Sequence, residues 1–150
     1  MKPTIIKYGL LALLSAAVLF LAALVFGNGL SYTSQAIIGY ASMFISLTFV
    51  FFGILHFRNK ENEGRITFGK AFTIGILISI FSAFGFAIID YLYTAVINPE
   101  FMTEYAAAMK AKGEEMENYS SSSLALFMFG IVMVMGIIVT LLSAFILQRK

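Results

Sequence analysis

The chain has 150 residues, of which 60% are hydrophobic and 12% charged, with a formal net charge of +2 and a mean hydropathy of +0.91. A soluble domain has about a quarter of its residues charged and about half apolar, so this composition excludes a soluble enzyme and a disordered tail. Because the chain has no cysteine and little net charge, it is neither a disulfide scaffold nor a nucleic-acid binder, and the lipid bilayer is its predicted partner.

Four apolar segments are long enough to cross a bilayer as helices. A helix rises about 1.5 Å per residue and the hydrocarbon core is about 30 Å thick, so a span needs about 20 residues. The segments have 19, 20, 27 and 24 residues and contain one charged residue, Asp90. Their apolar runs are continuous, whereas the strands of a membrane barrel alternate. The sequence therefore predicts an all-α membrane protein, a single integral domain forming a four-helix transmembrane bundle with spans at about 8–26, 36–55, 71–97 and 124–147.

Polar connections separate these spans. Residues 27–29, Gly-Asn-Gly, are typical of a turn, and Ser34 is a candidate cap for the second helix. The longest connection covers residues 98–123, where Asn98 is a candidate helix cap and Pro99 suits the first helical position. Residues 120–123, all serine, are predicted as a link that caps the last helix.

An amphipathic helix is predicted in the same long connection. Apolar side chains recur there at four-residue spacing, at Phe101, Tyr105 and Met109. Such a short helix lies on the outer membrane surface or caps the bundle. Three acidic residues that follow are predicted as a solvated face, and residues 118–120 match a glycosylation acceptor; the acidic residues are Glu114, Glu115 and Glu117.

The distribution of lysine and arginine predicts the orientation. Positive residues near span ends collect on the cytoplasmic side. Eight lie at the two termini and in the second loop, namely Lys2, Lys7, Arg58, Lys60, Arg65, Lys70, Arg149 and Lys150. The other side has two, Lys110 and Lys112. We therefore expect both termini in the cytoplasm, with the first apolar run retained because it is longer than a signal peptide's apolar region.

Small residues at every fourth position predict helix-packing faces, because helices in lipid associate by close contact. The row in the third span comprises Ala71, Gly75, Ser79, Ala83 and Ala87. The row in the fourth span comprises Gly136, Thr140 and Ala144. These rows are interpreted as seams within the bundle, with a homodimer seam as the alternative.

Asp90 is the one ionisable residue well inside a span. An intramembrane carboxylate marks a functional site by default, so Asp90 is a candidate cation or proton site. It lies about 9 Å from the centre of its span, toward the outer end. The alternative is a structural carboxylate that is hydrated or bonded to Tyr or Ser groups inside the bundle.

The second loop offers cations for the anionic cytoplasmic leaflet. The candidate lipid-headgroup contacts are Arg58, Lys60, Arg65 and Lys70. Residues 64–71 have the spacing of a phosphate-binding loop, but Ala71 stands where the magnesium-binding hydroxyl belongs. His56 is the sole histidine of a chain without cysteine, so no metal site is expected.

Several short motifs carry a resemblance to a known family. They are Ile38-Gly39-Tyr40-Ala41-Ser42-Met43, Phe51-Phe52-Gly53-Ile54, Phe57-Arg58-Asn59-Lys60, Ile66-Thr67-Phe68-Gly69-Lys70-Ala71 and Asn98-Pro99-Glu100-Phe101. Together they resemble a family of uncharacterised four-helix membrane proteins, a domain of unknown function common in Bacteroidota. Members often have Tyr-Arg-Asp where this chain has Phe57-Arg58-Asn59, which removes the acid of an Arg–Asp pair. The resemblance implies a multi-pass protein of the bacterial inner membrane and brings no activity or site.

Three classes of function remain open. The first is a non-enzymatic assembly or accessory protein that acts through helix–helix contacts, as a homo-oligomer or in a larger membrane complex. The second is an ion- or proton-coupled transporter or channel subunit that uses Asp90. The third is a lipid-headgroup-binding or lipid-modifying protein. The sequence contains no paired carboxylates, His–Asp pair or nucleophile–base set, so we expect no enzymatic activity and no cofactor.

Overall fold

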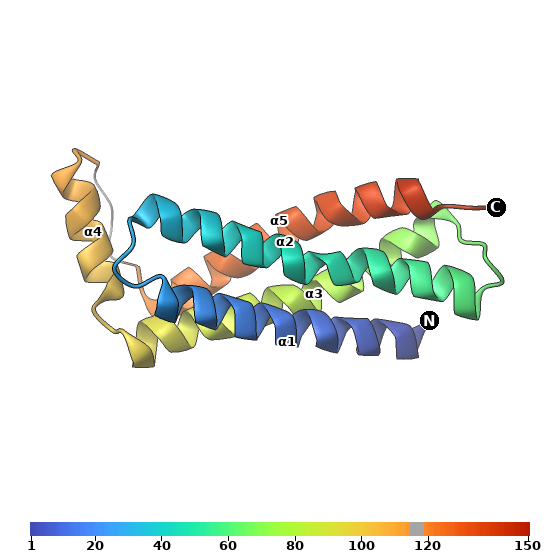
Figure 1. Cartoon of the computed structure of the whole chain (residues 1–150), viewed down its shortest axis with the longest axis horizontal. Coiled ribbons are helices and arrows are strands. Elements are labelled where there is room, and N and C mark those ends of the chain that lie inside the picture. Colours follow the sequence, from blue (N-terminus) through green and yellow to red (C-terminus); the bar gives the residue numbers. More distant parts are fainter. Residues whose placement is uncertain (115–118) are drawn as a thin grey trace.

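The computed structural model describes residues 1–114 and 119–150, and in this part of the chain every regular element is helical (Figure 1). Four long helices and one short helix follow each other as α1 (Lys2–Phe26), α2 (Tyr32–His56), α3 (Phe68–Leu92), α4 (Phe101–Ala111) and α5 (Ser121–Leu147). The π-helical turns η1 (Phe57–Glu61) and η2 (Tyr93–Ile97) extend α2 and α3. The acidic residues Glu115 and Glu117, and Asn118 of the glycosylation match, lie outside the described residues.

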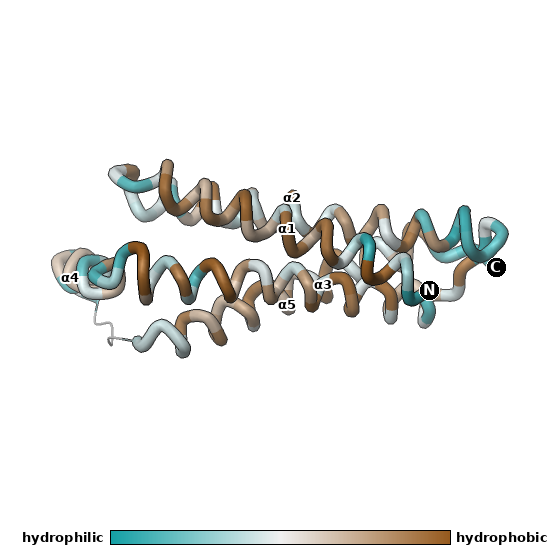
Figure 2. The backbone as a smooth tube through the Cα atoms, turned by 90° about the horizontal axis from the view of Figure 1, so that it is seen from below, coloured by the Kyte–Doolittle hydropathy of each residue, from teal (hydrophilic) through white to brown (hydrophobic). Residues whose placement is uncertain are grey.

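The four long helices are long and apolar enough to cross a membrane, and they run alternately up and down the bundle. Both chain ends lie at one end of the bundle, here called the terminal end (Figure 1). Helix α4 lies across the opposite end, here called the α4 end. Figure 2 shows hydrophobic residues along all four long helices and hydrophilic residues at both ends of the bundle.

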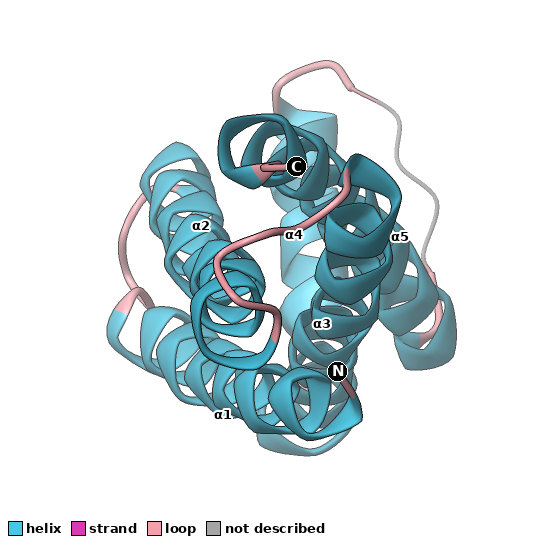
Figure 3. Ribbon diagram, turned by 90° about the vertical axis from the view of Figure 1, so that its right-hand side faces the viewer, coloured by secondary structure: helices cyan, strands magenta, loops and turns pink. Residues whose placement is uncertain are grey.

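Helix α3 is the central element of the bundle. It packs most extensively on α5 and α1 and also contacts α2 (Figure 3). Its buried face includes Ile74, Ile78 and Phe86, which are fully shielded. The outer faces of α1 and α5 instead expose large apolar side chains such as Val18 and Ile146. Such an outward apolar surface suits hydrocarbon rather than water.

Two predicted caps are wrong. Helix α2 begins at Tyr32, and its cap is Ser31, whose hydroxyl accepts a hydrogen bond from the Ser34 backbone N–H at 3.2 Å. Helix α4 begins after Glu100 with no side-chain cap, although the Asn98 carbonyl accepts from the Phe101 N–H. The reason is that Asn98 lies two residues before the cap position and belongs to the end of the preceding turn, where its N–H donates to the Tyr93 carbonyl at 2.7 Å and its side-chain Nδ2 lies 3.4 Å from Tyr93 Oη. For the last helix the predicted cap is confirmed, since Ser120 caps α5, but residues 121–123 form the first turn of that helix rather than a link.

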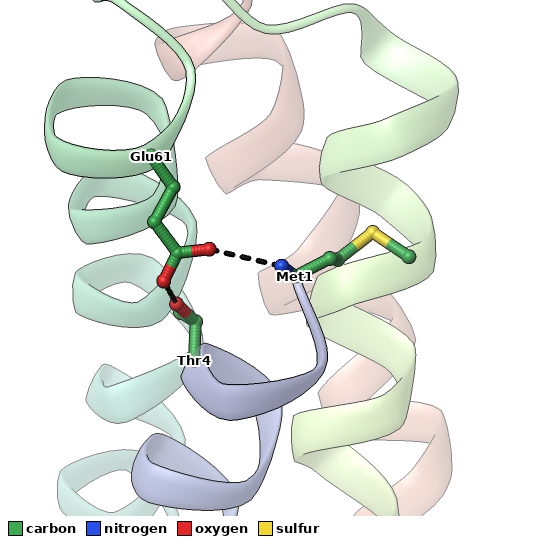
Figure 4. Close-up of polar contacts among 3 residues, drawn as sticks. All are labelled: Met1, Thr4 and Glu61. Atoms are coloured by element: carbon green, nitrogen blue, oxygen red, sulfur yellow. Dashed lines mark hydrogen bonds and ion pairs between the residues drawn. The ribbon is translucent and has the colours of Figure 1, made fainter.

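Contacts between distant segments tie the terminal end together. The Met1 ammonium lies 2.9 Å from Glu61 Oε2, and the Thr4 hydroxyl donates to the other carboxylate oxygen of Glu61 (Figure 4). Arg58 Nη1 donates to the Leu147 carbonyl at 3.2 Å. Residues 66 and 149 form an isolated antiparallel bridge. The loop between α2 and α3 therefore holds both the start of α1 and the end of α5.

Candidate functional site

A cavity of about 680 Å³ lies at the α4 end, with walls from all five α-helices. Small-molecule sites usually measure about 300–1,000 Å³ and are mostly apolar with a few polar groups. The apolar walls include Phe20 and Leu24 of α1, Met43 of α2, Phe86 of α3, Phe101 and Met102 of α4, and Leu124, Phe127, Met128 and Ile131 of α5. The cavity therefore has the size and lining of a small-molecule site.

Asp90 lies on the α3 wall of this cavity and is partly buried. Its backbone carbonyl accepts a hydrogen bond from Thr94 Oγ1 at 2.9 Å. Within the described residues, no donor group forms a hydrogen bond or ion pair with the Asp90 carboxylate. The carboxylate is thus available to a bound molecule.

The remaining polar wall groups are mainly phenols. Tyr32 and Tyr40 come from α2 and Tyr105 from α4, and the rings of Tyr32 and Tyr105 meet edge to face at 4.8 Å. Gln35 also lines the cavity, but its Nε2 donates to the Gly27 and Leu30 carbonyls, which fixes it on the turn between α1 and α2. The Tyr32–Tyr105 contact fastens α4 to α2 over the cavity.

The cavity is closed toward the middle of the bundle and open toward its side. At the inner end, Phe20 and Phe86 are buried and their rings lie 5.0 Å apart, and Met43 is buried beside them. On the side, the wall residues Tyr40 of α2, Tyr119 just before α5 and Phe127 of α5 are 49%, 49% and 70% exposed. The opening therefore lies along α2 and α5, on the surface that a bilayer would cover.

The predicted small-residue rows lie where α3 crosses α5. Ala71, Gly75, Ser79 and Ala83 are buried, as are Gly136, Thr140 and Ala144, whereas Ala87 is partly exposed. A Cβ added to Gly75 would lie 2.5 Å from Thr140 Cγ2. A Cβ added to Gly136 would lie 2.6 Å from Ser79 Cβ. Each glycine thus leaves room for the hydroxyl-bearing side chain of the opposite helix.

Sequence reasoning missed the small residues of the first span. Ala12 and Ala16 of α1 are fully buried, and a Cβ added to Gly85 of α3 would lie 2.7 Å from the Leu13 carbonyl oxygen. Gly9 is also buried, against Phe81. The spacing of Gly9, Ala12 and Ala16 follows one helix face and would have predicted this seam.

The four candidate headgroup cations all lie at the terminal end, but their environments differ. Arg58 is partly buried and donates to the Leu147 carbonyl. Lys60, Arg65 and Lys70 are exposed, and the Lys70 ammonium lies 5.6 Å from the centre of the Phe57 ring. Three of the four therefore remain accessible to a lipid surface.

Comparison with known proteins gives one match. The model of a family described as "Protein of unknown function (DUF4199)" matches residues 7–149, which include α2, α3, α5 and most of α1. No curated protein and no solved structure matches the chain. Since the match covers nearly the whole sequence, the chain belongs to the DUF4199 family of proteins of unknown function.

Proposed function

We propose that this chain is a non-enzymatic integral membrane protein that binds an amphiphilic small molecule in the cavity at the α4 end. The observation that carries the proposal is the cavity itself, whose apolar walls surround one carboxyl group, Asp90. The other polar walls in the described part of the chain are Tyr, Gln and Ser, and none of them forms a hydrogen bond with the Asp90 carboxylate. The described wall therefore contains no assembled nucleophile–base pair, which favours binding over chemistry.

The orientation and location are part of the proposal. Eight of the ten lysine and arginine residues lie at the terminal end or in its loop; Lys110 lies in the last turn of α4 and Lys112 directly follows that helix. The positive-inside rule then supports a cytoplasmic terminal end. The resemblance described above supports a bacterial inner membrane. In this orientation the cavity lies in the outer half of the bilayer and opens toward hydrocarbon.

Two other functions, transport through Asp90 and binding of lipid headgroups, are supported by fewer features of the structure. Ion or proton transport through Asp90 needs a path across the bundle, but fully buried Leu47, Ile78 and Val132 fill the interior between the cavity and the terminal end. Binding of anionic headgroups at Lys60 and Arg65 would not use the cavity, since these exposed cations lie at the other end of the bundle.

An assembly or accessory role, as a homo-oligomer or in a larger complex, is the second candidate. The small-residue rows do not favour it, because Gly75, Gly136 and their neighbours already pack inside the chain. Ala87 is the exception, since it lines a second, more open apolar groove between α3 and α5 with Phe84 and Ala125. This groove is where a partner helix would bind.

A fluorescent reporter tests the cavity directly. The chain contains no tryptophan, so Phe127→Trp places the single indole in the cavity wall. In phosphatidylcholine nanodiscs, we expect saturable quenching of this indole by dodecanol that carries bromine at its far end.

Two glycine variants in the same background control the experiment. A Cβ at Gly39 or at Gly130 meets no atom within 4 Å, but only Gly39 lines the cavity. Gly39→Leu should fill the cavity and remove the saturable quenching, and Gly130→Leu should leave it unchanged. Non-saturating quenching that is equal in all three proteins would refute the proposed function.

A further inference from the structure

We propose that the occupant of the cavity is a lipophilic cation, in which a single ammonium group pairs with Asp90 and one apolar chain fills the remaining walls. This inference rests on the proposed function that the cavity binds a small molecule. It adds the charge and the shape of that molecule.

The charge of the ligand follows from the charge of the walls. Among the described residues that line the cavity, Asp90 is the one with a carboxyl group, and none is Lys or Arg. A carboxylate among apolar groups is costly unless a cation accompanies it. In the described structure no cationic side chain pairs with Asp90, so a cationic ligand provides the charge that the walls lack.

The aromatic walls favour the same ligand. Tyr32, Tyr40 and Tyr105 line the cavity from two different helices. The faces of aromatic rings attract ammonium groups, by about 0.5–2 kcal/mol depending on desolvation. Met43 and Met128 add flexible apolar contacts for a chain of variable shape.

The size and the opening of the cavity limit the ligand to one chain. About 680 Å³ is within the range for a drug-sized molecule, and a phospholipid with two acyl chains is larger. The side opening along Tyr40 and Phe127 lets a chain enter from the bilayer. An aminophospholipid would also bring a phosphate toward Asp90, where like charges repel. A free long-chain amine has neither problem.

The experiment compares two probes of the same length in the Phe127→Trp protein. Bromine-terminated dodecylammonium should bind about tenfold tighter than bromine-terminated dodecanol after correction for partitioning, because an ion-paired hydrogen bond replaces a neutral one. Asp90→Asn should remove this preference and leave dodecanol binding in place. Glu104→Gln removes an exposed carboxylate of α4 that does not line the cavity, so the preference should persist.

The outcomes separate the two proposals. Equal saturable binding of both probes would overturn the cationic ligand but leave the proposed function standing. Saturable binding of neither probe would overturn the proposed function. The two probes are compared in the protein that keeps Asp90. The proposal can therefore be tested even if the Asp90→Asn variant folds poorly. Replacing phosphatidylcholine by phosphatidylethanolamine should not weaken dodecylammonium binding; a severalfold loss would identify an aminophospholipid as the occupant and refute the single-chain ligand.

Discussion

Single glycines determine how closely the two most extensively packed helices approach. Gly75 of α3 faces Thr140 of α5, and Gly136 of α5 faces Ser79 of α3, so each side has one residue without a Cβ. Without a hydrophobic driving force between helices in lipid, such close contact is the main source of association. The hydroxyls of Ser79 and Thr140 also lie 3.4 Å apart, which adds a polar contact to the seam.

Replacing Gly136 by Ala should therefore destabilise the bundle. The added Cβ would lie 2.6 Å from Ser79 Cβ, and overpacking of this kind costs about 1–3 kcal/mol of unfolding free energy. Unfolding in mixed detergent micelles, followed by circular dichroism, measures the loss. Gly130→Ala is the matched control on the same helix, because its Cβ meets open space and Ala favours helix by about 1 kcal/mol. Equal losses in both variants would contradict the seam.

At the scale of helices, buried hydroxyl groups join α1, α2 and α3. Ser46 of α2 donates to the Ala12 carbonyl of α1 at 2.8 Å. Its oxygen lies 2.7 Å from Ser82 Oγ of α3, and since the Ser46 proton is used, Ser82 is the donor. Both serines are fully buried. These two hydrogen bonds connect α2 to α1 and to α3 inside the bundle.

Ser46→Ala should lower the unfolding free energy by about 1–2 kcal/mol, in the range for hydrogen bonds between membrane helices. Thr48→Ala is the control on α2, because the exposed Thr48 hydroxyl bonds only to the Ile45 carbonyl of its own helix. Adding Ser82→Ala to Ser46→Ala should cost less than the sum of the single changes, because both remove the same bond. A strictly additive double variant would show that the two serines act independently.

At the scale of the whole molecule, the two ends of the bundle differ. The terminal end is held by the segment between α2 and α3: Glu61 of this segment contacts the start of α1, and Arg58 donates to the end of α5. The α4 end contains the cavity, and α4 covers it through Phe101, Met102 and Tyr105. In the proposed orientation, the terminal end faces the cytoplasm and the cavity lies in the outer half of the membrane.

Cysteine labelling tests this orientation with little background, since the chain has no cysteine. Asn28 lies in the turn at the α4 end and Asn59 in η1 at the terminal end, and both are exposed. In intact cells, a membrane-impermeant maleimide should label Asn28→Cys and should reach Asn59→Cys only after permeabilisation. The opposite pattern would place both termini outside and the cavity in the inner leaflet.

The four long helices can be predicted from the sequence because the pattern that indicates each one, an unbroken apolar run, lies within a single segment. In lipid each backbone amide needs a partner within its own segment, so an unbroken apolar run of sufficient length already implies a helix. The prediction of Ser34 as the cap of α2 is wrong, and by residue type Ser31 is equally suitable. The extended backbone of Ser31 decided between them. Asn98 is similarly suitable as a cap, but α4 begins two residues too late for it, and its side chain donates to the Tyr93 hydroxyl instead.

The sequence by itself determined the four apolar helices, the asymmetry of positive charge between the two ends and the choice of Asp90 as a candidate site, because each depends on residues close together in the chain. Only the tertiary structure brought Phe20, Met43 and Met128 around Asp90. These residues come from different helices, and no periodicity within one helix specifies which neighbour it faces. The cavity therefore depends on how α3 packs with its neighbours, through close contacts at Gly75, Gly85 and Gly136.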